Sequence, residues 1–151
     1  MKKLLTFALL CAALLPCGCH YSPPVPQGQP ELVVDGRDII VYAYLNRDFM
    51  PEYPPDGPPL TVYIRLFAPD SQPLPQGLSA DHAWLVNGRS VWATDLAKLD
   101  GTALPCNSGF QASGGPTWDV GTDVDATVRV ILPNRDTRCI LVPRCSIGRS
   151  V

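Results

Sequence analysis

The side chains best suited to chemistry lie at Asp81-His82, with Ser79 just before them. Together they supply the three side-chain types of a serine hydrolase. A catalytic triad is assembled by geometry rather than by adjacency along the chain, and the sequence contains no Gly-x-Ser-x-Gly elbow. We therefore expect a protein that is not an enzyme. A hydrolase that uses His82 is the alternative.

Three carboxylates at Asp119, Asp123 and Asp125 form a second group. Carboxylates two residues apart share one face of a strand, and Ca²⁺ prefers oxygen ligands. The spacing does not match the calcium-loop signature, which closes with a glutamate. We favour a solvated turn leading into a strand, expect no metal and no cofactor, and keep the three aspartates as weak metal candidates.

Two aromatic residues are candidates for contact with a partner. Tyr53 lies in the proline-rich stretch Met50–Pro59, and Trp118 follows a glycine-rich stretch. A stiff proline-rich loop loses little conformational entropy on binding. The simpler interpretations are a rigid connection between strands for the loop and a core residue for Trp118.

The N-terminus has the layout of a secretory signal peptide. Lys2 and Lys3 precede an uncharged, mostly apolar run from Leu4 to Leu15, and small residues follow it. The run is too short to span a bilayer, which needs about 20 residues. We expect an exported protein without a spanning helix.

The end of this run resembles the signal peptide of bacterial lipoproteins, in which cleavage occurs just before a lipidated cysteine. Cys19 fits best because the small Gly18 precedes it, although Pro16 stands where the family usually has leucine. The resemblance implies a lipid on Cys19, and His20 in place of aspartate implies the outer membrane. An ordinary signal peptide, which would leave a soluble periplasmic or secreted protein, is the alternative.

Composition divides the chain into three parts. We predict a signal peptide at 1–18, a lipidated cysteine with a proline-rich tether at 19–30, and one folded domain at 31–151. Removal of Lys2 and Lys3 lowers the net charge from −2 to −4. This charge argues against nucleic acid, which binds to basic patches.

The folded part has the period-two pattern of β-strands. In 60–67 and 126–132, every second residue is apolar, and 39–45 is more uniformly apolar, as in a central strand. Asn87-Gly88 and Asp35-Gly36 are hairpin signals. A two-residue loop at Asn87-Gly88 would place Trp84 opposite Val91 and Ala83 opposite Trp92, and the only helical hint is Thr94–Leu99. We predict an all-β domain of about seven strands, built as a two-sheet antiparallel sandwich of immunoglobulin-like or transthyretin-like type, with a small barrel as the runner-up.

Three cysteines remain after processing and lipidation, at 106, 139 and 145. An oxidising compartment favours a disulfide between two of them. Placing Cys106 in a long loop beside the last strand favours Cys106–Cys145, with Cys106–Cys139 as the second choice.

These features predict an exported lipoprotein held at the envelope by a lipid anchor. Its domain is expected to bind another envelope protein or a glycan without doing chemistry. One specific alternative is a subunit of an envelope machine, since the small transthyretin-like lipoproteins of type VI secretion are similar in size and plan.

Overall fold

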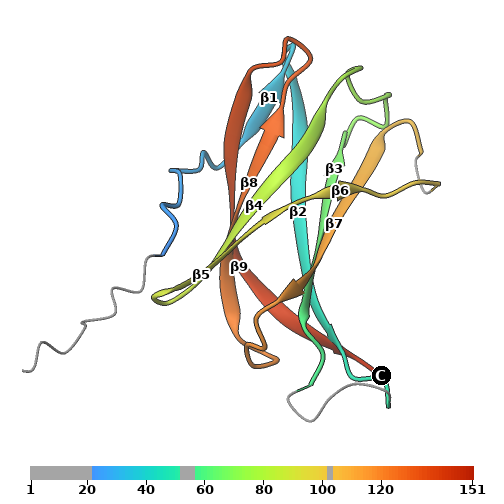
Figure 1. Ribbon diagram of the computed structural model, residues 1–151. Coiled ribbons are helices and arrows are strands. Elements are labelled where there is room, and N and C mark those ends of the chain that lie inside the picture. The colour runs from blue at the N-terminus through green and yellow to red at the C-terminus, as the bar shows by residue number, and fades with distance from the viewer. Residues whose placement is uncertain (1–21, 52–56, 102–103) are drawn as a thin grey trace, which may run out of the picture.

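A computed structural model describes residues 22–51, 57–101 and 104–151, and every regular element in these ranges is a β-strand (Figure 1). The all-β prediction is therefore confirmed, with more strands than expected. The strands are β1 Leu32–Val34, β2 Arg37–Asp48, β3 Leu60–Phe67, β4 Ser79–Asn87, β5 Ser90–Asp95, β6 Ala97–Lys98, β7 Asn107–Gly115, β8 Asp123–Ile131 and β9 Thr137–Ser150.

The strands form one continuous hydrogen-bonded sheet in the order β5-β4-β8-β9-β2-β3-β7-β6, with β1 paired to β2. The sheet curls until β5 comes close to β7, so that it is nearly closed into a barrel-like shape (Figure 1). This arrangement fits the runner-up prediction of a small barrel better than two separate sheets.

The long strand β9 makes the sheet continuous because it changes partner along its length. It pairs antiparallel with β8 from Thr137 to Ser146, and Ile147–Ser150 then pairs parallel with β2. The bend lies at Pro143-Arg144, where Arg144 has a φ of 51° and its N–H donates to the Asp125 carboxylate at 2.9 Å. The parallel pair corrects the expectation of a purely antiparallel fold.

Alternating apolar residues fill the interior, as the sequence predicts. The inward residues of β3 and β8 are all buried, as is Leu132 directly after β8. Outward residues such as Tyr63 and Arg65 are exposed. The buried positions are Leu60, Val62, Ile64 and Leu66 on β3, and Ala126, Val128, Val130 and Leu132 along and after β8.

Both predicted hairpins form, and one has a different register. Asp35 and Gly36 have φ values of 51° and 73°, as a type I′ turn requires, and join β1 to β2. In the other hairpin the two loop residues are Gly88 and Arg89, because Asn87 pairs with Ser90. Glycine at the first central position with positive φ is typical of a type II′ turn.

This shift corrects the cross-strand pairs of the second hairpin. Trp84 lies opposite Ala93 rather than Val91, and Leu85 lies opposite Trp92. Trp92 therefore points into the molecule and packs against the core.

Two segments expected to be irregular or helical are strands. The helical hint at Thr94–Leu99 is wrong, because this segment ends β5 and forms β6. Half of the expected long loop around Cys106, residues 100–117, is β7, which pairs with β3. The alternation in β7 is masked by serine and glycine residues, which have low β-propensity.

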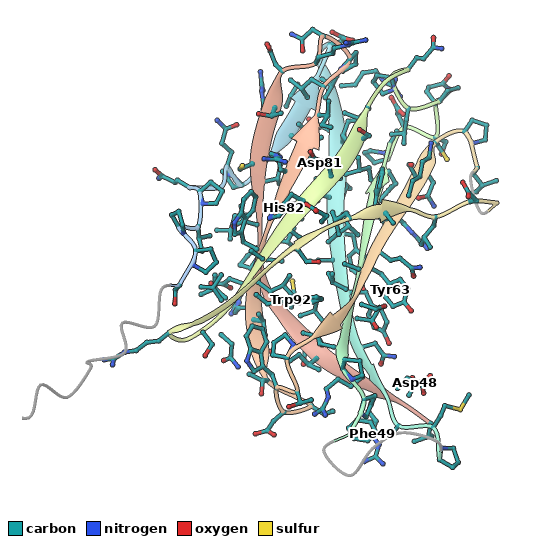
Figure 2. The ribbon with its side chains drawn as sticks, viewed as in Figure 1. Asp48, Phe49, Tyr63, Asp81, His82 and Trp92 are labelled. Carbon is teal, nitrogen blue, oxygen red and sulfur yellow. The ribbon has the colours of Figure 1, made fainter. Side chains whose placement is uncertain are left out.

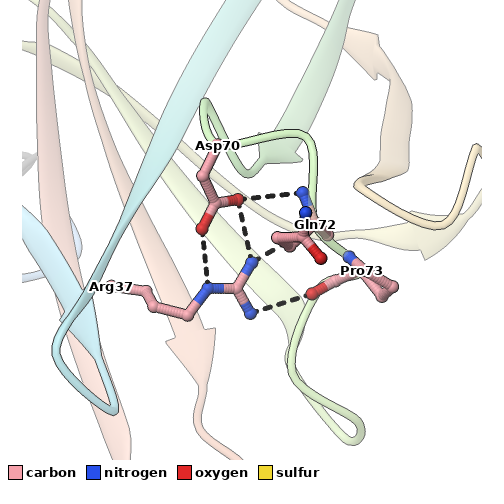
Figure 3. Close-up of polar contacts among 4 residues, drawn as sticks. All are labelled: Arg37, Asp70, Gln72 and Pro73. Atoms are coloured by element: carbon pink, nitrogen blue, oxygen red, sulfur yellow. Dashed lines mark hydrogen bonds and ion pairs between the residues drawn. The ribbon is translucent and has the colours of Figure 1, made fainter.

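Arg37 ties the β1–β2 hairpin to the connection between β3 and β4 (Figure 3). Its Nε and Nη2 donate to the two carboxylate oxygens of Asp70 at 2.9 and 3.0 Å. Its Nη1 and Nη2 also donate to the carbonyls of Pro73 and Gln72 at 2.9 and 3.3 Å. One guanidinium thus fixes the course of this loop.

The described part of the expected tether already contacts the domain. Gln29 forms a parallel bridge with Ile140: its N–H donates to the Cys139 carbonyl, and its carbonyl accepts from the Leu141 N–H, both at 2.8 Å. Among the described residues, no helix is long and apolar enough to cross a membrane.

Candidate functional site

The outer face of β2, β3 and β7 carries a hollow of about 420 Å³ that we term the tyrosine hollow. Its volume lies within the range of small-molecule sites. Its walls are aromatic and amide side chains with one arginine. The lining residues are Tyr42, Tyr44, Asn46, Tyr63, Ile64, Arg65, Leu99, Asn107 and Gly109.

Strand register brings the three tyrosines together. Tyr42 and Tyr44 are two apart on β2 and therefore share its outward face. Tyr44 lies directly opposite Tyr63 on β3, with ring centroids 6.0 Å apart and planes inclined by 33°. The three residues are 52%, 43% and 37% exposed. Three exposed aromatic rings on adjoining strands make this face a candidate binding surface.

Arg65 is the charged group of the hollow. It lies opposite Tyr42 on β2 and opposite Gly109 on β7, and the Leu99 side chain lies over Gly109. It makes no hydrogen bond or ion pair with any residue that the structure describes. None of the described residues that line the hollow is acidic.

Asn46 leaves a buried acceptor at one end of the hollow. Its Nδ2 donates to Ser150 Oγ at 2.8 Å, and its Oδ1 is buried without a partner among the described residues. Buried polar atoms are nearly always hydrogen-bonded. The hollow thus combines aromatic rings with polar side chains.

His82, the predicted catalytic candidate, lies on the other half of the sheet, on β4. Its Nδ1 is 2.8 Å from Asp95 Oδ1 on β5, and its ring lies 4.4 Å from that of Trp84. The neighbouring Asp81 points to β8 and not to His82. Ser79 makes no hydrogen bond to His82 in the described part of the chain, so the side chains expected for a triad are not brought together.

Asp81 forms a bidentate ion pair with Arg129. Nε and Nη2 of Arg129 donate to the two carboxylate oxygens of Asp81 at 2.8 and 2.9 Å. These hydrogen bonds lower the pKa of Asp81 below its usual value. Figure 2 shows Asp81 and His82 next to each other on β4, on the side of the molecule away from Tyr63. The pair is a cross-strand contact, separate from the tyrosine hollow.

The predicted Cys106–Cys145 disulfide does not form in this structure, in which Cys106, Cys139 and Cys145 are all free thiols. The second choice, Cys106–Cys139, is absent for the same reason. Cys106 precedes β7, and β2 and β3 separate β7 from β9, which carries the other two cysteines. The error came from treating the segment after Cys106 as a loop.

Cys145 is buried among core residues instead. Its Sγ donates to the Val142 carbonyl at 3.3 Å, and burial raises the pKa of the thiol to about 11. It behaves as a small hydrophobic residue, as expected for a cysteine outside a disulfide.

The three weak metal candidates do not form a site. Asp119, Asp123 and Asp125 are exposed, and the described ranges contain no group of three or more side chains that could hold a metal ion. Asp125 instead accepts the hydrogen bond from Arg144 N–H.

Of the predicted partner contacts, Trp118 is half-buried and packs against the core, and its carbonyl accepts from Arg47 Nη1 at 3.0 Å. Tyr53 and Cys19 lie outside the described residues. The tyrosine hollow is not evident from the sequence alone, although the alternation of apolar residues in β3 already places Tyr63 on the outward face. The missing signal was the pairing of β3 with β2, which brings Tyr63 opposite Tyr44.

Comparison of the chain with protein-family models, with curated proteins and with solved structures finds no match.

Proposed function

We propose that this protein is a non-catalytic binding protein of the cell envelope and that the tyrosine hollow is its binding surface. The observation that carries the proposal is the cluster of three exposed tyrosines around a hollow that also contains the guanidinium of Arg65, which is unpaired among the described residues. Tyrosine supplies a large contact area with few rotatable bonds and is enriched at binding surfaces. The ligand is an envelope protein or a glycan.

The proposal includes export and a lipid on Cys19 at the outer membrane. Its support is the resemblance of the first 20 residues to lipoprotein signal peptides. The described N-terminal segment bridges to β9 at Gln29 and Ile140, while the hollow lies on β2, β3 and β7. Figure 1 shows this segment leaving on the side of the molecule away from β3 and β7. A tether leaving from β9 would keep the hollow accessible. A soluble periplasmic or secreted protein remains the alternative.

We also keep the immunoglobulin-like or transthyretin-like grouping as a proposal. It is supported by the two groups of strands that β9 joins, β5-β4-β8 on one side and β2-β3-β7-β6 on the other. This grouping is compatible with the subunit of an envelope machine that the sequence suggests. An experimental structure of the protein with its ligand tests it.

The binding surface is tested by site-specific photo-crosslinking in cells. A photoreactive residue replaces Tyr63 in one strain and Arg89, at the tip of the β4–β5 hairpin, in the control strain. We expect a defined adduct, protein or glycan, from position 63 and none from position 89. Equal adducts from both positions, or none from either, would refute the hollow as the binding surface.

The anchor has its own test. Cys19→Ser should release the protein from the membrane fraction and abolish incorporation of a labelled fatty acid. Membrane association that persists in this variant would refute the lipid anchor and leave the binding surface unaffected.

The hydrolase alternative is favoured by one contact, the 2.8 Å bond from His82 Nδ1 to Asp95, which is how a carboxylate orients a catalytic imidazole. His82→Ala distinguishes the two functions. A binding protein keeps its crosslinked adduct in this variant, whereas a hydrolase loses its activity.

A further inference from the structure

On the basis of the proposed function, we infer that the tyrosine hollow binds an anionic glycan. A sugar ring packs on the tyrosines, and a carboxylate or phosphate group of the sugar binds Arg65. The inference is drawn from the ring geometry, the unpaired charge and the amide groups of the hollow.

The tyrosines form a platform of the right kind for a sugar ring. Tyr44 and Tyr63 are neighbours across two strands, with ring centres 6.0 Å apart, and Tyr42 lies two residues before Tyr44 on β2. The rise over two residues separates Tyr42 from Tyr44 by about 7 Å along the strand. The planes of the Tyr44 and Tyr63 rings are inclined by 33°. The apolar C–H face of a pyranose covers such rings, while its hydroxyl groups point to the rim.

The charge of the hollow selects an anion. Arg65 has no carboxylate partner within the described residues, and the described lining contains no acidic side chain that would repel an anion. A guanidinium binds a carboxylate or a phosphate with two parallel hydrogen bonds. Arg65 is exposed on the outer face of β3, so such a group can reach the guanidinium from solvent.

The amide groups supply the remaining recognition. Asn46 lines one side of the hollow, on β2, and its Nδ2 donates to Ser150 Oγ at 2.8 Å. Asn107 lines the opposite side of the hollow, on β7. Amides on two sides and aromatic rings between them match a ligand that is polar at its edge and apolar on its face.

The shape of the hollow favours a glycan over a folded protein. A concave site of about 420 Å³ holds a small ligand or a short oligosaccharide. A folded protein partner would instead bury a broad area of roughly 800 Å² on each side. A protein partner is therefore an outcome of the test and not the proposal.

The test uses the purified full-length protein and an array of oligosaccharides of matched length. The array contains neutral, uronate-containing and phosphorylated members, and isothermal titration follows up the binders. We expect an anionic oligosaccharide to bind at least tenfold more tightly than its neutral counterpart. The affinities of the uronate-containing and the phosphorylated oligosaccharides, compared with each other, show which anion is the natural one.

Three variants and one control assign the roles. Arg65→Gln should remove the tenfold preference for the anionic sugar, Tyr63→Phe should have little effect, and Tyr63→Ala should weaken both neutral and anionic sugars. Arg89→Gln, an exposed arginine outside the hollow, should change nothing. All variants must keep the melting temperature of the unchanged protein.

The possible failures are distinguishable. Equal affinity for neutral and anionic sugars, or a preference that survives Arg65→Gln, refutes the anionic ligand. Absence of glycan binding together with a protein adduct from position 63 refutes the glycan and leaves the proposed function standing. Absence of both glycan binding and any adduct refutes both.

Discussion

Trp92 on β5 lies directly against Gly115 on β7, so close that a Cβ on Gly115 would be 2.6 Å from Cζ3 of the indole. This contact spans the gap between the two strands that nearly close the sheet (Figure 2). Glycine at 115 is therefore required by space, because the ring occupies the place of a side chain.

Gly115→Ala should destabilise the protein by about 1–3 kcal/mol, because the added methyl overpacks the seam. Urea unfolding followed by tryptophan fluorescence measures the change. Trp92→Leu in the same chain should recover part of the loss, which a double-mutant cycle would quantify. Ser90→Ala, at an exposed position of β5, is the control and should be neutral. Purely additive effects of the two substitutions would contradict the contact.

Arg47 is a buried charge that connects two loops. It is 5% exposed, and its Nε donates to the Pro58 carbonyl at 2.9 Å while its Nη1 donates to the Trp118 carbonyl at 3.0 Å. Arg47→Met would leave both carbonyls without these donors. We expect the free energy of unfolding to fall by about 2–4 kcal/mol.

Arg149→Met is a matched control for this prediction. The guanidinium carbons of Arg47 and Arg149 lie 5.0 and 4.5 Å from the centre of the Phe49 ring, but Arg149 is exposed. Loss of a surface cation–π contact should cost less than about 1 kcal/mol. Equal destabilisation by both substitutions would show that the ring contact, and not the two carbonyls, dominates.

The sequence predicted the strands wherever the alternation was made by large apolar residues. The inward faces of β3 and β8 were correct residue by residue, because leucine and valine at every second position have no alternative to burial. β7 was missed because its residues include Ser108, Gly109, Ser113, Gly114 and Gly115, which lack that signal. The disulfide prediction failed with it, since it depended on a loop in that place.

The tyrosine hollow could not be predicted because it depends on pairing between strands. Tyr42 and Tyr44 lie in a stretch that seemed uniformly apolar, and only the register with β3 shows that they face outward beside Tyr63. The change of partner in β9 likewise depends on the bend at Pro143-Arg144. Local patterns do not encode such non-local pairings.

The Asp81–Arg129 pair makes stability depend on acid pH. Hydrogen bonds from Arg129 lower the pKa of Asp81 in the folded state. The pair therefore stabilises the protein above the unfolded-state pKa of about 3.9, and this contribution is lost as the pH falls through the lowered folded-state pKa.

Asp81→Asn should thus reduce stability at pH 7 and have little effect at about pH 2. Both side chains are more than one-third exposed, at 39% and 38%, so the loss should be about 1 kcal/mol or less. Urea midpoints at the two pH values measure the difference. A loss of equal size at both pH values would indicate a packing effect and not the ion pair.

Burial of Cys145 predicts a poorly reactive thiol. Its pKa is raised to about 11, chiefly because burial disfavours the thiolate, so only about one molecule in a thousand carries the reactive thiolate at pH 8. A single-cysteine variant that keeps Cys145 should react with a disulfide reagent at least tenfold more slowly than one that keeps the half-buried Cys106. Labelling of Cys145 as fast as that of Cys106 would show that the thiol is accessible and would contradict its buried position beside the Val142 carbonyl.

The raised pKa of Cys145 also makes the stability of the protein depend on alkaline pH. The buried thiol stabilises the folded state below pH 9, where the cysteine is protonated in both the folded and the unfolded state, and this contribution is lost as the pH rises through about 11. Cys145→Val should remove that alkaline loss from urea midpoints measured between pH 8 and 11.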